Sequence, residues 1–177
     1  WNHRWEYDKA PEVFFRTLFR LKEEGVPFRL IVLGRSYRKA PEIFEAARHR
    51  LKEEILHFGY AKSRAEYARL LWQADILPVT SRQDFFGGSV AEAIFCNCYP
   101  LLPNRLAYPE HIPEEKHAVH LYENEEELYS KLRDAVLRIG AIRERAAFRD
   151  FVARYDWSIL VADYDKAFGQ LAQIKPK

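Results

Sequence analysis

The sequence predicts an α/β domain built on a doubly wound parallel sheet. Short apolar runs alternate along the first two thirds of the chain with longer stretches whose apolar residues recur at helical spacing. The connections between them are short, and this order is typical of parallel β-α-β units. Because crossovers between parallel strands are right-handed, such units assemble into a sheet with helices on both faces.

The first helix is expected to begin at Pro11 and to stop at Gly25. Proline suits the first helical position because its ring fixes φ and its missing N–H would have no partner there. Glycine suits the position just past the end of a helix. Phe14, Leu18 and Leu21 fall on one face, which is therefore expected to pack on the sheet.

The remaining elements follow in order along the chain. Five short apolar runs are expected to be strands, and they are 28–34, 55–60, 74–80, 99–103 and 117–122. Further helices are expected to begin at Pro41, Ser63, Ser89 and Asn124, with a break at Gly140 and a restart at Trp157. Ser63 and Asn124 each have a glutamate three residues later, which is the pattern of a capping box.

Composition excludes several classes of protein. The 177 residues suit one domain, and 48% of them are hydrophobic. A net charge of +2 does not indicate a nucleic-acid-binding or membrane-binding protein. No run approaches the roughly 20 apolar residues of a membrane span. The chain contains no methionine, so we expect it to be a piece of a longer protein.

The two cysteines and six histidines do not form the pattern of a metal site. Cys96 and Cys98 lie in an apolar run and are expected to be buried thiols, which favours a reducing, cytoplasmic setting. His117 and His120 are three residues apart in an expected strand, so their side chains should point to opposite faces. The sequence therefore predicts no metal ion.

Asp84 and Glu92 stand on either side of a glycine pair, directly after the fourth expected strand. Ligands of doubly wound sheets bind at the carboxyl ends of the strands. Gly87 and Gly88 allow a tight turn and a close approach of backbone to ligand. The next helix is expected to start near Ser89, and a helix start attracts anions. Glu92, one turn into this helix, could accept hydrogen bonds from the two hydroxyls of a ribose.

The same residues have a purely structural alternative. Ser89 and Glu92 also have the spacing of a capping box, and spacing alone gives this alternative about equal weight. Asp84 taken alone is more often a loop residue than a catalytic one.

A basic pair precedes the first helix. Arg4 and Lys9 flank a loop that is expected to follow a truncated first strand, at the same edge of the sheet. Two cations beside a helix start suit a diphosphate, and a solvated loop is the alternative. Gly34 and Gly59 each end a strand at this edge, although turn geometry alone would also account for them.

Four segments together resemble a known family. The segments are NHRWEYDKAPE, HFGY, FFGGSVAEAI and NRLAYPEHIP. Two carboxylates at this spacing, with a basic pair before the first helix, resemble the nucleotide-binding half of retaining nucleotide-sugar glycosyltransferases of the GT-B fold. Within that group the segments are similar to the tRNA-queuosine mannosyltransferase family, over residues 1 to about 125.

The resemblance implies a role for each candidate residue. Residues 1–177 would be the Rossmann-like donor-binding domain, with terminal helices from about 124, and the acceptor-binding amino-terminal domain would be absent from this chain. The donor would be GDP-mannose and the acceptor queuosine in tRNA, with no cofactor or metal. Asp84 would face the transferred sugar and Glu92 would hold the ribose. The diphosphate would be held by Arg4, Lys9 and the backbone of Gly87, Gly88 and Ser89. Gly59 and Tyr60 would border the base, and Gly34 would end the neighbouring strand at the same edge.

One departure from the family leaves other functions open. Asp84 stands where glutamate is usual in the family. A shorter carboxylate would fit a non-catalytic nucleotide-binding or interaction module that keeps the fold. Two further alternatives are a UDP-sugar-dependent transferase acting on a saccharide or lipid, and a regulatory domain of flavodoxin type, which would not need the basic pair.

Overall fold

The computed structural model describes residues 1–36, 40–145 and 148–172. The paired strands within these ranges run parallel, in two groups. One group is β1 (Leu30–Leu33) and β2 (Ile55–Gly59); the other is β3 (Ile76–Pro78), β4 (Tyr99–Pro103) and β5 (Leu121–Tyr122), in that order. The predicted α/β class with parallel strands is confirmed. β1 and β3 belong to different groups, and residues of both line an apolar cavity of about 340 Å³.

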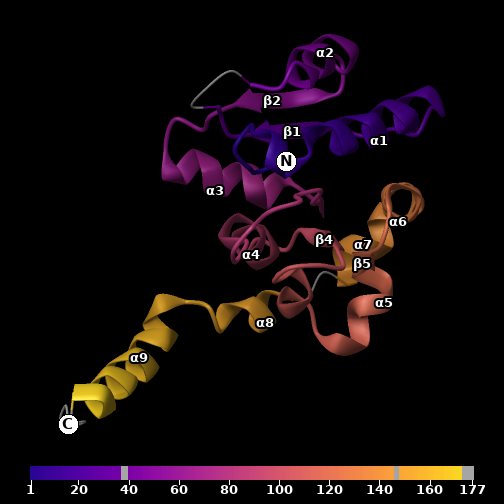
Figure 1. Cartoon of the computed structure of the whole chain (residues 1–177). Helices are drawn as coiled ribbons and strands as arrows, with labels where there is room; N and C mark the ends of the chain where they lie inside the picture. Colours follow the sequence, from indigo (N-terminus) through magenta and orange to yellow (C-terminus); the bar gives the residue numbers. More distant parts are fainter. Residues whose placement is uncertain (37–39, 146–147, 173–177) are drawn as a thin grey trace.

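Helices alternate with these strands along the chain and continue beyond the last strand (Figure 1). They are α1 (Pro11–Glu23), α2 (Ile43–Arg50), α3 (Arg64–Gln73), α4 (Gly88–Phe95), α5 (His117–His120), α6 (Glu125–Leu137), α7 (Ile139–Arg145), α8 (Arg149–Ala153) and α9 (Trp157–Ala172). The predicted caps are confirmed at two starts. Ser63 Oγ accepts from the N–H of Glu66 at 3.1 Å, and Asn124 Oδ1 accepts from the N–H of Glu127 at 3.0 Å.

The predicted strand 117–122 is wrong over most of its length. Its first four residues form α5, and only the last two pair with β4. The helical turn lets both histidine rings reach backbone carbonyls, His117 Nε2 at 3.0 Å from Pro109 O and His120 Nδ1 at 2.8 Å from Pro100 O. Residues three apart share a face of a helix, so the prediction of opposite faces is also wrong.

The predicted break at Gly140 lies two residues too late. Gly140 is inside α7, and the interruption falls at Arg138, whose φ of −107° and ψ of 25° leave the helical region. The predicted restart at Trp157 is confirmed as the first residue of α9.

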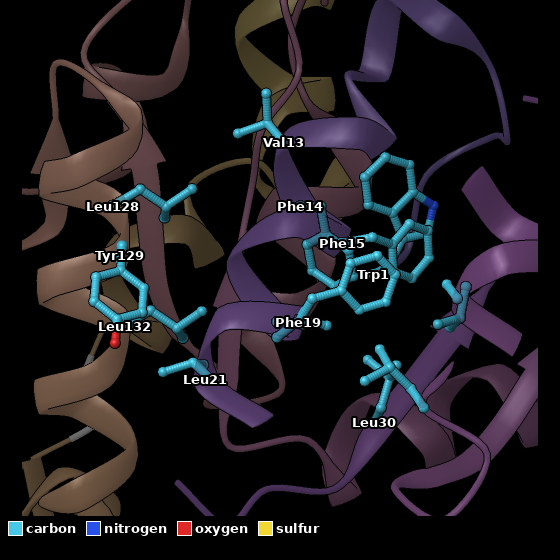
Figure 2. Close-up of a cluster of buried hydrophobic side chains, with 14 of the residues drawn as sticks. Trp1, Val13, Phe14, Phe15, Phe19, Leu21, Leu30, Leu128, Tyr129 and Leu132 are labelled. Atoms are coloured by element: carbon cyan, nitrogen blue, oxygen red, sulfur yellow. The ribbon is translucent and has the colours of Figure 1, made fainter. Parts of the chain in front are cut away.

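One hydrophobic core is built on α1 (Figure 2). Trp1 packs edge-on against Phe14, with ring centroids 5.1 Å apart, on one side of the helix. Leu128 and Leu132 of α6 approach from the other side. Full burial of one such side chain stabilises the fold by about 1.5–3 kcal/mol. These contacts fix α1, and with it the loop that enters the helix at the carboxyl edge.

The first residues of the chain lie beside β1. The N–H of Leu33 donates to Trp1 O at 2.7 Å, and the indole N–H of Trp5 donates to Leu33 O at 3.2 Å. The N–H of Gly34 donates to Gly59 O at 3.1 Å, which joins the ends of β1 and β2. Residues 1–5 therefore cross the carboxyl end of β1, where the candidate site lies.

A second core lies between α3, α4 and the β3–β4–β5 strands, and it contains both cysteines. Cys96 and Cys98 are buried and not joined in a disulfide, as predicted. Among the described residues, no helix is long and apolar enough to cross a membrane.

α9 differs from the other long helices because none of its residues is buried. It projects away from the rest of the chain (Figure 1). Its exposed apolar side chains are Trp157, Ile159, Tyr164, Phe168 and Leu171.

Candidate active site

Lys9 and Asp84 lie together at the carboxyl edge of the strands. Lys9 exposes only 6% of its surface, because the short 3-10 turn Tyr7–Lys9 directs it inward. Its Nζ donates to the backbone oxygen of Gln83 at 2.6 Å and lies 3.4 Å from Asp84 Oδ2. The same Nζ also lies 3.2 Å from Asp8 Oδ2. The ammonium group therefore has a fixed position at this edge, where an anionic ligand could share its charge.

Asp84 is held in its ionised form. Partial burial opposes ionisation, but the Lys9 ammonium and the hydroxyl of Tyr108 outweigh it and hold the pKa of Asp84 below its usual value. Tyr108 is almost fully buried and donates to Asp84 Oδ2 at 3.2 Å. The Asp84 carboxylate therefore has a fixed position and a negative charge, and it could stabilise a positively charged group of a ligand.

The turn between Asp84 and α4 depends on one glycine. Gly87 has φ +82°, and a Cβ there would lie 3.2 Å from both His111 Nε2 and Tyr108 Cε1. Its backbone is the N-cap of α4, with no side-chain cap bond. Gly88 is the first helical residue; it is exposed, and a Cβ added there would meet no atom within 4 Å. The start of α4 is thus open to a ligand.

The capping-box alternative for Ser89 and Glu92 is wrong. Both residues lie inside α4, beyond its N-cap at Gly87. Ser89 Oγ lies 3.3 Å from His3 Nδ1 instead. The Glu92 side chain is exposed, and its Oε2 accepts from the hydroxyl of Tyr67 at 2.8 Å. Glu92 is therefore not needed to cap the helix.

Glu92 lines a cavity of about 440 Å³, called here the edge cavity. Four of the predicted residues meet in its wall, namely Arg4, Gly34, Tyr60 and Glu92. Tyr67 lines the same cavity, and burial, with Glu92 nearby, raises the pKa of its phenol. A carboxylate, a guanidinium and an aromatic ring around a cavity of this size can contact the ribose, phosphate and base of a nucleotide.

The two members of the predicted basic pair, Arg4 and Lys9, have different surroundings in the structure. Arg4 is on the edge cavity with its side chain 58% exposed, and it pairs with Glu6 at 3.3 Å, whereas Lys9 is buried beside Asp84. His3 is buried near Ser89, and this burial lowers its pKa to about 3, so the ring is neutral at physiological pH. Gly59 does not line the edge cavity, and its contribution is the backbone bond to Gly34.

Sequence reasoning missed three residues of the site. His3 and Tyr108 lie within segments quoted for the family resemblance, but nothing in their spacing indicated a contact. Tyr67 lies on α3, and nothing in its spacing from Glu92 indicated that its hydroxyl would donate to that carboxylate. Among the described residues, no group of three or more His, Cys, Asp or Glu side chains could hold a metal ion.

Comparison with known families gives one match across most of the chain. The family of glycosyl transferases group 1 matches residues 2–150. The tRNA-queuosine alpha-mannosyltransferase of Drosophila melanogaster is 41% identical over 132 residues, which are 75% of this chain and 34% of the fly protein. The chain therefore spans about a third of the length of that relative.

Solved structures share the fold at low identity. HepE of Anabaena in complex with UDP superposes with a TM-score of 0.77 at 16% identity, over 96% of this chain and 47% of HepE. Sucrose-phosphate synthase of Thermosynechococcus elongatus gives a TM-score of 0.78 at 16% identity, over 97% of this chain and 44% of the synthase. At such identities the likeness shows the fold alone, and that fold is the GT-B type.

Proposed function

The chain belongs to the glycosyl transferases group 1, and from this premise we propose that it is the donor-binding half of a retaining mannosyltransferase. The proposed donor is GDP-mannose and the proposed acceptor is queuosine in a tRNA. The 41% identity to an enzyme with that acceptor in its name supports the proposal. Residues 1–177 would work together with an acceptor-binding domain that precedes them in the whole enzyme.

The observation that carries the proposal is the placement of Glu92. It lines the edge cavity, it is free of any capping role, and its carboxylate holds only the Tyr67 hydroxyl in this structure among the described residues. Two ribose hydroxyls could replace or join that hydroxyl. Tyr60 would then border the base, and Arg4 would reach the phosphates from the same wall. Gly59 would act only by holding the end of β1 through its carbonyl, which accepts from the N–H of Gly34.

The sugar and the diphosphate would lie toward Lys9 and Asp84. As the bond from the sugar to the diphosphate breaks, negative charge grows on the leaving nucleoside diphosphate and positive charge on the sugar. The fixed ammonium of Lys9 would stabilise the negative charge on the diphosphate, and the carboxylate of Asp84 would stabilise the positive charge on the sugar. The open start of α4, with Gly87, Gly88 and Ser89, would supply backbone N–H groups to the phosphates.

Glu92→Gln is expected to weaken GDP binding by about 1–3 kcal/mol. Glutamine offers one acceptor oxygen in place of two, so it cannot hold both ribose hydroxyls. The thermal stability of the unliganded protein should hardly change, because Glu92 caps no helix. Calorimetry with GDP and 2′-deoxy-GDP, on both proteins, measures the effect and its link to the ribose.

The matched control is Glu66→Gln at the start of α3, where the Glu66 carboxylate accepts from the backbone N–H of Lys62 and the Glu66 N–H donates to the N-cap Ser63. It should leave GDP binding unchanged. The proposal fails if Glu92→Gln binds GDP as tightly as the wild type and the wild type binds 2′-deoxy-GDP as tightly as GDP. The nucleotide would then not bind through Glu92. Tighter binding of UDP than of GDP would reassign the donor.

Transfer is expected to continue in the presence of EDTA. The proposed counter-charges to the diphosphate are Lys9 and Arg4, so no divalent cation is needed in that role. Initial rates of the full-length enzyme with GDP-mannose, measured with EDTA and with added Mg²⁺, should agree. Loss of activity in EDTA that Mg²⁺ restores would contradict the assignment of these two cations.

A further inference from the structure

The surface next to Asp84 carries an aromatic ring that the proposed donor does not use. Phe85 exposes 94% of its surface, directly after the residue proposed to face the transferred sugar. A single exposed apolar side chain is ordinary on a protein surface. Phe85 differs because it directly follows Asp84 and because of the side chains that surround its loop.

The loop that carries Phe85 is fixed by its neighbours. The N–H of Arg82 donates to Asp8 O at 2.8 Å, and Lys9 Nζ donates to Gln83 O at 2.6 Å. From the other side, Arg105 Nε donates to Ser81 O at 3.3 Å. An aromatic residue on a backbone held in this way is presented at low entropic cost to a binding partner.

Two cations lie on the same joined loops. Arg82 and Arg105 are both exposed, and within the described part of the chain neither forms an ion pair with a carboxylate. The acidic groups nearest in the same loops, Asp8 and Asp84, are already paired with Lys9. Tyr7, on the turn bonded to the Arg82 loop, is 62% exposed. The name aromatic–arginine patch is used here for the surface formed by Tyr7, Arg82, Phe85 and Arg105.

We propose that the aromatic–arginine patch binds single-stranded RNA, with an unstacked base on Phe85 and flanking phosphates on Arg82 and Arg105. Aromatic side chains hold unstacked RNA bases by stacking, and arginine binds phosphate through its planar fork. Because Phe85 follows Asp84, a base stacked there lies beside the sugar to be transferred. This inference rests on the proposed function and adds to it the contact that recognises the acceptor.

Phe85→Ala in the full-length enzyme should raise KM for tRNA by roughly 5- to 160-fold, because losing the stack of one base on an aromatic ring weakens binding by about that factor. Phe85→Trp should retain the wild-type KM, because it keeps an aromatic ring. The KM for GDP-mannose should stay the same in both variants. Trp72→Ala is the matched control, since it removes another exposed aromatic side chain, on α3, and should change neither constant.

Arg82→Ala tests the phosphate contact separately. The association constant for a single-stranded RNA 12-mer, measured by fluorescence anisotropy, falls as the salt concentration rises. In Arg82→Ala the magnitude of the slope of its logarithm against the logarithm of salt concentration should be smaller by about 0.7. Arg69→Ala, which removes an exposed arginine on α3, should leave this slope unchanged.

The outcomes separate the two proposals. If the wild-type enzyme transfers no sugar to tRNA, the proposed function fails. If it does transfer, and Phe85→Ala leaves KM for tRNA unchanged, only the RNA-binding role of the patch is overturned. A rise in KM for GDP-mannose instead would place Phe85 in the donor site. If Trp72→Ala raises KM for tRNA as much as Phe85→Ala does, the effect is not specific to the patch, and its RNA-binding role is again overturned.

Discussion

Lys9→Ala is expected to lower kcat/KM for transfer on the order of 100- to 1000-fold, which is the usual loss for a fixed group that stabilises charge in the transition state. Lys9 is buried, and its Nζ contacts Asp84 and the carbonyl of Gln83. Alanine removes the proposed counter-charge of the diphosphate. It also leaves the Asp84 carboxylate partly buried without its cation.

Calorimetry distinguishes the role of Lys9 in phosphate binding from a role in the fold. Binding of GDP should weaken by about 1.5–3 kcal/mol, whereas binding of guanosine should change little, because guanosine has no phosphate. Lys22→Ala, which removes an exposed lysine paired with Glu54, is the control and should affect neither ligand. Equal losses for GDP and guanosine would show that Lys9 supports the fold instead.

The same substitution should change the titration of Asp84. In the wild type its pKa is lowered, so the stability it contributes is present above the ordinary value of 3.8 and is lost as pH falls through the folded value. Without Lys9, burial raises the pKa with less to oppose it, and protonation should begin at higher pH. Carboxyl resonances in an NMR titration measure this shift directly.

Gly34→Ala is expected to destabilise the fold by about 3–5 kcal/mol. Gly34 has φ +106°, where residues with a side chain are strained, and a Cβ there would lie 2.2 Å from the backbone oxygen of His3. Both the backbone and the crossing segment would have to move. Thermal unfolding should show a fall in Tm of roughly 6–20 °C for a chain of this size.

Gly140→Ala is the matched control, since Gly140 lies in α7 with ordinary φ and no atom within 4 Å of the added carbon. Its Tm should be unchanged or slightly higher, because alanine favours a helix. A Gly34→Ala protein that unfolds at the wild-type temperature would show that residues 1–5 do not cross the end of β1.

Sequence patterns predicted the parts of the fold that local rules determine. The starts of α1, α3 and α6 follow from Pro11, Ser63 and Asn124, because capping acts within three residues. The edge location of Asp84 and Glu92 follows from the order of strands and helices. These features need no knowledge of which distant residues meet.

The site contacts could not be predicted because they join distant parts of the chain. Tyr67 and Glu92 are 25 residues apart, and Tyr108 and Asp84 are 24 apart. Neither pair has a spacing that a helix or strand would explain. Capping-box spacing gave the wrong alternative for Glu92 about equal weight. The structure differs because the backbone of Gly87, at φ +82°, begins the helix without a side-chain cap.

The exposed apolar residues of α9 have a practical consequence for handling this chain by itself. Trp157, Tyr164 and Phe168 remain in water, where they favour self-association at high concentration. Purified residues 1–177 should therefore be less soluble than a shorter version that ends at Asp156. Light scattering of the two proteins at matched concentration would measure how much of the self-association comes from α9.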